Sequence, residues 1–210
     1  MAKDYPEFLT VIAPVKAIGA AAGERLLTDV LAAARNAAFD EAGVVIAVNL
    51  GRVTLATTSY VKSGLLPLFF SGQRHADKAS SGLVDSQGIS AINLYPVFTN
   101  VDPEVLDTVH EVFGGRRLPV ITAVLTDEGL NEGRINGYLD EALARTLRLI
   151  RGREQVTALD LAAEFSAEGI KPTAWNNRLN DLWRLRLLRR TKRGKAWWYK
   201  SVIKELDYGR

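Results

Sequence analysis

The sequence lacks cysteine, so the chain can form neither a disulfide nor a thiolate metal site. Its two histidines, His75 and His110, are too few for a typical zinc site. It also lacks any uninterrupted run of about 18 apolar residues, and residues 1–10 carry no apolar signal core. These absences predict a cytoplasmic protein with no membrane-spanning helix and no resident metal.

Charge is distributed unevenly along the 210 residues, although the whole chain has a net charge of only +3. Residues 1–150 contain 13 Lys/Arg and 17 Asp/Glu, a net charge of −4. Residues 151–210 contain the other 14 Lys/Arg and 7 Asp/Glu, a net charge of +7. This division predicts two domains, 1–150 and 151–210, of which the second binds a polyanion.

Strand and helix patterns alternate through the first 150 residues. Apolar runs predict strands at residues 8–13, 44–48, 89–94 and 118–125. Helical periodicity predicts helices at 19–42 (ended by Gly43), from Thr57 or Thr58 to about Phe70, after the Asp102-Pro103 start, and at 139–150. Residues 71–88 are expected to form a surface loop and residues 129–137 a hinge. The order predicts an α/β fold with a mostly parallel sheet covered by helices.

The segment from Val44 to Phe70 combines a buried strand, a turn and a helix that begins with hydroxyl side chains. Its stretch V-x-L-A-T-T-S-Y-V-K-S-G-L-L resembles the STAS-like domains of bacterial proteins, related to the anti-sigma-factor antagonists. In those antagonists a hydroxyl of an Asp-Ser-Ser/Thr-Gly motif at this helix start is phosphorylated. This chain has Thr57-Thr58-Ser59-Tyr60 there, without the Asp and the Gly. The resemblance implies a STAS-like domain over residues 5–150 with Ser59 or Thr58 as a phosphorylation site; N-capping of the helix is the simpler interpretation.

The basic tail has the element order helix, turn, helix, strand, basic turn, strand. Thr157 to Asp160 is typical of a capping box, Gly169 ends the first helix, and Thr173 is placed to cap a second helix over residues 174–187. Two strands, 188–191 and 196–200, flank a basic turn at 192–195. We expect Trp175 to lie in the core, and one of the alternating Trp197 and Trp198 to be buried and the other half exposed.

The pattern N-R-L-x-x-L…L-L-R-R…R-G-K…W-Y in this tail resembles the recognition helix and wing of bacterial winged helix-turn-helix regulators. The resemblance implies that the second helix contacts base edges through amide side chains, and that basic residues contact phosphate or the minor groove. The implied DNA-binding residues are Thr173, Asn176, Asn177, Arg178, Asn180, Lys192, Arg193 and Lys195.

Residues for catalysis do not form a recognisable motif. No G-x-S-x-G elbow supports Ser59 with His75 and Asp77 or Asp85 as a hydrolase triad, and no glycine-rich phosphate loop predicts a nucleotide cofactor. The acidic residues Asp127, Glu128 and Glu132 are a possible divalent-ion site, yet acidic residues after a strand are commonplace. The sequence therefore predicts a protein that is not an enzyme and needs no cofactor.

These patterns favour a DNA-binding regulator or adaptor, in which the STAS-like domain contacts a protein partner and the winged helix contacts duplex DNA. A homodimer is expected, because reading a palindromic site normally requires two copies. One alternative is a non-catalytic interaction subunit of a larger bacterial complex, such as an antiphage defence or stress assembly, with the winged helix docking on protein or RNA. Another is a phosphorylation-switched antagonist of a sigma-factor regulator.

Overall fold

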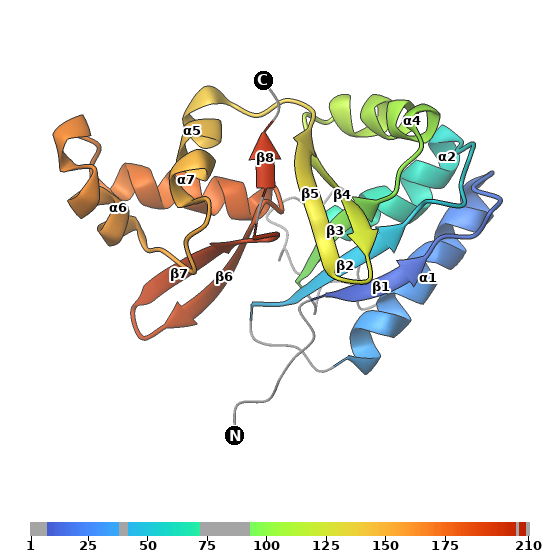
Figure 1. The fold of residues 1–210 in the computed structure, drawn as a ribbon, viewed down its shortest axis with the longest axis horizontal. Coiled ribbons are helices and arrows are strands. Elements are labelled where there is room, and N and C mark those ends of the chain that lie inside the picture. Colours follow the sequence, from blue (N-terminus) through green and yellow to red (C-terminus); the bar gives the residue numbers. More distant parts are fainter. Residues whose placement is uncertain (1–7, 38–41, 72–92, 205, 209–210) are drawn as a thin grey trace, which may run out of the picture.

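The computed structural model describes residues 8–37, 42–71, 93–204 and 206–208, and it has a mixed α/β fold (Figure 1). Its main sheet has six strands in the order β1-β2-β3-β4-β5-β8. Neighbouring strands are parallel except for β4 and β5, which are antiparallel. The strands are β1 (Leu9–Ile12), β2 (Val44–Asn49), β3 (Leu94–Thr99), β4 (Val120–Thr126), β5 (Gly129–Asn136) and β8 (Leu206–Tyr208).

Three helical segments cover one face of this sheet. They bury one hydrophobic cluster against β1, β2 and β3, which includes Leu26, Tyr60, Leu65 and Val109. The segments are α1 (Ala20–Asn36), the run α2 (Thr58–Tyr60), η1 (Val61–Leu65) and η2 (Leu66–Phe70), and α4 (Pro103–Gly114). The middle run changes from α to π to 3-10 geometry along its length, so it is not the single regular helix that the sequence predicts.

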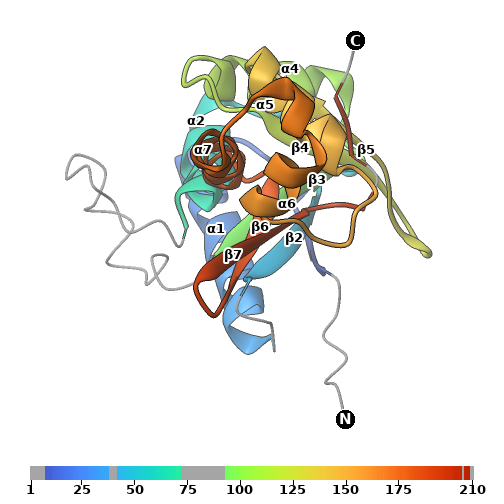
Figure 2. The same cartoon turned by 90° about the vertical axis from the view of Figure 1, so that its left-hand side faces the viewer.

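A second cluster lies on the opposite face and joins the sheet to the basic tail (Figure 2). Tyr95 and Val97 of β3 belong to the same buried cluster as Trp183 and Leu187. The elements that contribute are α5 (Glu141–Ile150), α6 (Ala158–Glu164), α7 (Pro172–Arg184), β6 (Leu188–Arg193) and β7 (Ala196–Ser201). The core therefore continues across residue 150, where the sequence predicts a domain boundary.

Several predicted elements are confirmed in place. β2 covers the predicted strand and ends one residue later, and α5 begins two residues after the predicted start and ends at the predicted Ile150. Asp102 caps α4 by accepting a hydrogen bond of 2.9 Å from the Glu104 amide, with Pro103 in the first turn. No helix among the described residues is long and apolar enough to span a membrane.

Other predicted elements are wrong in position or type. α1 ends at Asn36, and Gly43 instead leads into β2 with φ 95°, where a Cβ atom would lie 2.2 Å from the Asn93 carbonyl oxygen. The third strand begins at Leu94, so residues 89–92 of the predicted strand, like nearly all of the predicted loop at 71–88, lie outside the described residues. This strand contains Pro96, which lies ahead of the β3–β4 ladder that begins at Phe98. Proline is tolerated there because no partner requires its missing N–H group.

The predicted hinge at residues 129–137 forms β5, which pairs with β4 through a tight turn at Asp127 and Glu128. Strand β8 was not predicted. It brings the end of the described chain back to β5, where Leu206 pairs with Gly133. The basic tail thus contributes β8 at one edge of the main sheet, and β1 lies at the other.

Candidate nucleic-acid interface

Two helices and a hairpin of the basic tail form a compact unit at one end of the molecule, on the left in Figure 1. The capping box of α6 is confirmed: the Asp160 amide donates to Thr157 Oγ1 at 3.2 Å, and the Thr157 amide donates to Asp160 Oδ2 at 2.8 Å. α6 ends at Glu164, before the predicted stop at Gly169, and Gly169 instead ends the short 3-10 turn that follows, with φ 67°. These local signals fix the angle at which the chain enters α7.

The face of α7 that points outward carries polar side chains. Thr173, Asn176 and Asn177 are exposed at i, i+3 and i+4, whereas Trp175 and Leu179 are fully buried, as the sequence predicts for Trp175. The prediction that Thr173 caps α7 is wrong, because the helix begins one residue earlier at Pro172 with Lys171 in the N-cap position. Thr173 therefore lies within the first turn and keeps its hydroxyl on the outer surface.

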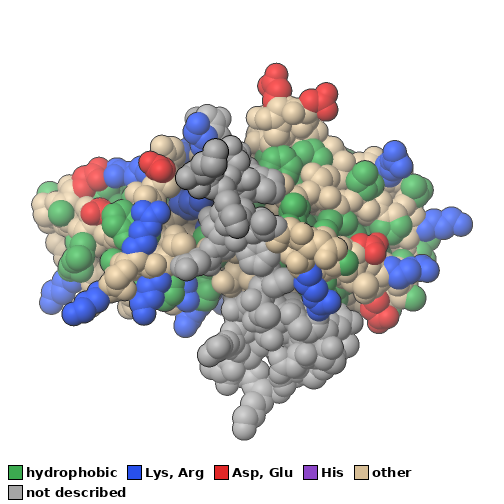
Figure 3. All heavy atoms as spheres, turned by 90° about the horizontal axis from the view of Figure 1, so that it is seen from below, with side chains coloured by type: hydrophobic (Ala, Val, Ile, Leu, Met, Phe, Trp, Pro, Cys, Tyr) green, Lys and Arg blue, Asp and Glu red, His purple; other side chains and the backbone are tan. Residues whose placement is uncertain are grey.

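The hairpin β6–β7 extends from the end of α7 and carries the exposed cations. Its turn is formed by Gly194, which has φ 59°, and Lys195. Lys192, Arg193 and Lys195 are all exposed, and a backbone bridge between Val156 and Tyr199 adds a third short extended segment beside β7. Lys and Arg side chains gather at this end of the molecule in Figure 3.

Arg190 joins the hairpin to α7. Its guanidinium lies 3.3 Å from the ring centroid of Trp183 and 4.2 Å from that of Trp197, and Nη1 donates a hydrogen bond of 2.8 Å to Asn180 Oδ1. Burial lowers the pKa of Arg190, and the nearby Tyr199 opposes that shift. Asn180, predicted to contact bases, therefore has its carbonyl oxygen engaged inside the protein.

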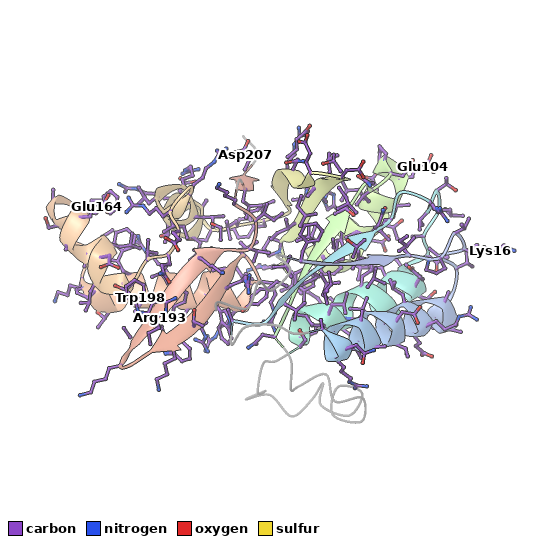
Figure 4. The ribbon with its side chains drawn as sticks, turned by 60° about the horizontal axis from the view of Figure 1, so that its bottom comes forward. Lys16, Glu104, Glu164, Arg193, Trp198 and Asp207 are labelled. Carbon is purple, nitrogen blue, oxygen red and sulfur yellow. The ribbon has the colours of Figure 1, made fainter. Side chains whose placement is uncertain are left out.

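The other aromatic and cationic side chains form similar pairs. Arg178 lies 5.2 Å above the Trp175 ring and is half-buried, which holds it against the helix. The expectation that Trp197 or Trp198 is buried is wrong, because Trp197 is 36% exposed and Trp198 is half-buried. Figure 4 shows Trp198 and Arg193 close together on the hairpin, where the guanidinium lies 5.5 Å from the ring centroid.

The C-terminal end of α7 is anchored to the end of η2 by buried polar contacts. Arg186 is 1% exposed, has φ 62° and donates hydrogen bonds to the Phe69 carbonyl at 2.8 Å and to the Ser71 carbonyl. Burial lowers its pKa to about 10. Because Arg186 takes a left-handed conformation, α7 ends at Arg184 rather than at the predicted residue 187. Sequence reasoning missed this anchor, since a basic residue in a basic tail gives no sign of burial.

The hydroxyl groups at residues 57–59 begin α2. Thr57 is the N-cap residue, and its Oγ1 accepts hydrogen bonds from the amides of Tyr60 at 3.3 Å and Gly19 at 3.0 Å. Ser59 is exposed, with Oγ 3.0 Å from Thr57 Oγ1, and Thr58 is half-buried. The capping interpretation is confirmed for Thr57, whereas phosphorylation of Ser59 or Thr58 stays a prediction.

Among the described residues, those considered for metal binding are not assembled into a site. Asp127, Glu128 and Glu132 are all exposed around the β4–β5 turn. The part of the chain that the structure describes contains no group of three or more potential ligands able to hold a metal. His75, Asp77 and Asp85 lie outside the described residues.

Comparison of this chain with protein-family models, with curated proteins and with solved structures finds no match. Its function must therefore be inferred from the surface itself.

Proposed function

We propose that this protein is a DNA-binding regulator or adaptor whose basic tail is a winged helix-turn-helix unit that contacts duplex DNA. The observation that supports this most is the combination of an exposed amide face on α7 with exposed cations on the adjoining hairpin. In winged helix-turn-helix proteins the second helix enters the major groove, and the surrounding basic residues contact the backbone. The element order α6–α7–β6–β7 fits this mode of binding.

Asn176 and Asn177 are the side chains best placed to specify sequence, since an amide can pair bidentately with the N6 and N7 atoms of adenine. Asn180 is less suited to bidentate pairing with a base, because its carbonyl oxygen accepts a hydrogen bond from Arg190. Its NH₂ group can still donate a hydrogen bond outward. Lys192, Arg193 and Lys195 then supply phosphate contacts that are independent of sequence.

The experiment is binding of the full chain to duplex DNA, compared with a Lys192→Ala/Arg193→Ala/Lys195→Ala variant. We expect the variant to bind duplexes of any sequence about tenfold more weakly or worse at low salt. A control variant removes the same charge from exposed positions of the main-sheet unit, which is the described part of residues 8–150. Figure 4 shows that one of these positions, Lys16, lies at the opposite end of the molecule from Arg193. The control changes Lys16, Arg52 and Arg116 to Ala. Equal binding by both variants and the wild type would contradict the proposal and favour docking on protein or RNA.

We propose further that the main-sheet unit makes the protein contact expected of the STAS-like resemblance, and that its partner is a second copy of the chain. β1 has a strand neighbour on one side only among the described residues. Four exposed apolar side chains lie near the end of β1. They are Ile12, Val15, Ile18 and Leu55. The isolated β-bridge between Ala17 and Ala56 places the segments that carry Ile18 and Leu55 side by side. An uncharged edge strand beside an apolar patch pairs readily with its own two-fold copy.

Sedimentation of the wild type and of an Ile12→Lys/Leu55→Lys variant tests this contact. We expect a dimer for the wild type and a folded monomer for the variant, because a charge on the strand edge and on the patch opposes pairing. A wild type that stays monomeric at all concentrations would exclude the contact.

A further inference from the structure

Trp197 presents a flat aromatic surface beside the DNA-contacting residues proposed above. The guanidinium of Arg190 covers one side of its indole, with Cζ 4.2 Å from the ring centroid. The side chain is nevertheless 36% exposed. Part of the indole surface is therefore accessible to a ligand, although Arg190 packs against the ring.

The indole is held rigidly. Arg190 is itself packed against Trp183 at 3.3 Å and bound to Asn180 Oδ1 at 2.8 Å, so Trp183, Arg190 and Trp197 form a three-layer stack that connects α7 to β7. A side chain fixed in this way loses little conformational entropy when a ligand stacks on it.

The groups around Trp197 select a ligand with a flat ring and a negative charge. Lys192 is its partner in the β6–β7 register, with Nζ 5.8 Å from the ring centroid. An aromatic platform with adjacent cations is the arrangement on which unpaired nucleobases stack while the cations contact the neighbouring phosphates. A base inside a regular duplex already has both faces stacked, so it cannot use this platform.

We propose that Trp197 stacks on an unpaired nucleobase, so that the preferred target of this unit is duplex DNA next to an unpaired base. The inference rests on the proposed function and specifies the form of DNA that the same surface binds. A bulge, a frayed end and a junction between single-stranded and double-stranded DNA all present such a base.

Trp198 provides the matched control. It alternates with Trp197 on β7 and therefore faces the opposite side of the hairpin. There it packs against Arg193 and lines a hollow of about 300 Å³ whose charged residues are Glu154, Lys192, Arg193 and Lys200. A base stacked on Trp197 lies on the other side of the hairpin, so removing the Trp198 ring is not expected to change a preference for an unpaired base.

The experiment measures the affinity of the full chain for a fully paired duplex and for the same duplex carrying one unpaired base. The wild type should bind the second about tenfold more tightly, a typical effect of stacking one base on an aromatic ring. Trp197→Leu should lose this preference while it still binds the paired duplex. Trp197→Phe should restore part of the preference, and Trp198→Leu should keep all of it. Circular dichroism checks that each variant is folded.

The outcomes distinguish the stacking role of Trp197 from the proposed binding of duplex DNA. Equal binding of both duplexes by the wild type, or a preference that survives in folded Trp197→Leu, overturns the stacking role and leaves duplex binding intact. Absence of binding to either duplex at low salt overturns the proposed function and the stacking role with it.

Discussion

The indole Nε1 of Trp183 donates a hydrogen bond of 3.1 Å to the hydroxyl of Tyr95, across a sequence separation of 88 residues. Trp183 belongs to α7 and Tyr95 to β3, and both are buried. The guanidinium of Arg186 also lies over the Tyr95 ring, with Cζ 5.6 Å from its centroid. The proposed recognition helix is thus attached to a central strand of the sheet and moves with it.

Removing the Tyr95 hydroxyl tests how much this attachment contributes to stability. In Tyr95→Phe the Trp183 N–H group remains buried without its acceptor, so we expect a loss of about 1–3 kcal/mol in the free energy of unfolding. Urea denaturation measures the change. The double variant Tyr95→Phe/Trp183→Phe measures the coupling between the two side chains. Strictly additive effects would show that the hydrogen bond contributes nothing of its own.

Tyr60 is a second buried tyrosine, and its hydroxyl has no hydrogen-bond partner in the part of the chain that the structure describes. Burial raises its pKa from 10 to about 12. Below pH 10 the hydroxyl is protonated in both the folded and the unfolded states. Between about pH 10 and pH 12 only the unfolded state releases the proton, so the contribution of Tyr60 to stability decreases as the pH rises.

Tyr60→Phe should therefore be as stable as the wild type at pH 7, or more stable by up to about 1 kcal/mol, because it removes an unpaired buried hydroxyl. The advantage should increase between pH 10 and pH 12. Arg186 also titrates in this range, but it is present in both proteins, so its contribution cancels in their difference. Urea denaturation at a series of alkaline pH values gives the comparison. Parallel stability curves for the two proteins would show that Tyr60 ionises normally.

Gly23 of α1 and Gly64 of η1 let two helical segments approach closely. A Cβ atom on Gly23 would lie 2.5 Å from the Tyr60 carbonyl oxygen and 2.9 Å from the Gly64 nitrogen. In an exposed helix, Gly→Ala normally stabilises by up to about 1 kcal/mol. Here Gly23→Ala should destabilise by about 1–3 kcal/mol, because backbone atoms cannot move aside cheaply.

Gly114, at the end of α4, is the control for that substitution. It is exposed, and a Cβ atom there would have no heavy atom within 4 Å. We expect Gly114→Ala to be neutral or slightly stabilising in thermal unfolding. A Gly23→Ala variant that behaves in the same way would mean that the two segments do not pack at this distance.

Features determined by a few neighbouring residues were predictable from the sequence. The Thr157–Asp160 capping box and the Asp102-Pro103 helix start are examples, since each depends on hydrogen bonds within one helical turn. The exposed face of α7 follows from helical periodicity alone. For the same reason the positions of Asn176 and Asn177 on the surface could be anticipated.

Features that depend on distant parts of the chain were not predictable. Strand β8 is three residues long and exists because β5 offers an edge, which no local pattern around Leu206 reveals. The engagement of Asn180 by Arg190 requires the hairpin to fold back on α7. The third strand was predicted at 89–94, but its continuation through Pro96 to Thr99 was not, because tolerance of the proline depends on where the neighbouring ladder begins.

The most direct test of the central claim is the salt dependence of binding between the full chain and duplex DNA of random sequence. Contacts from the hairpin cations to phosphate predict a linear decrease of log affinity with log salt concentration. The slope should be smaller by about 3 in the Lys192→Ala/Arg193→Ala/Lys195→Ala variant, about one for each phosphate that the variant no longer neutralises. Binding that does not respond to salt, or the same slope in both proteins, would contradict DNA recognition by this surface.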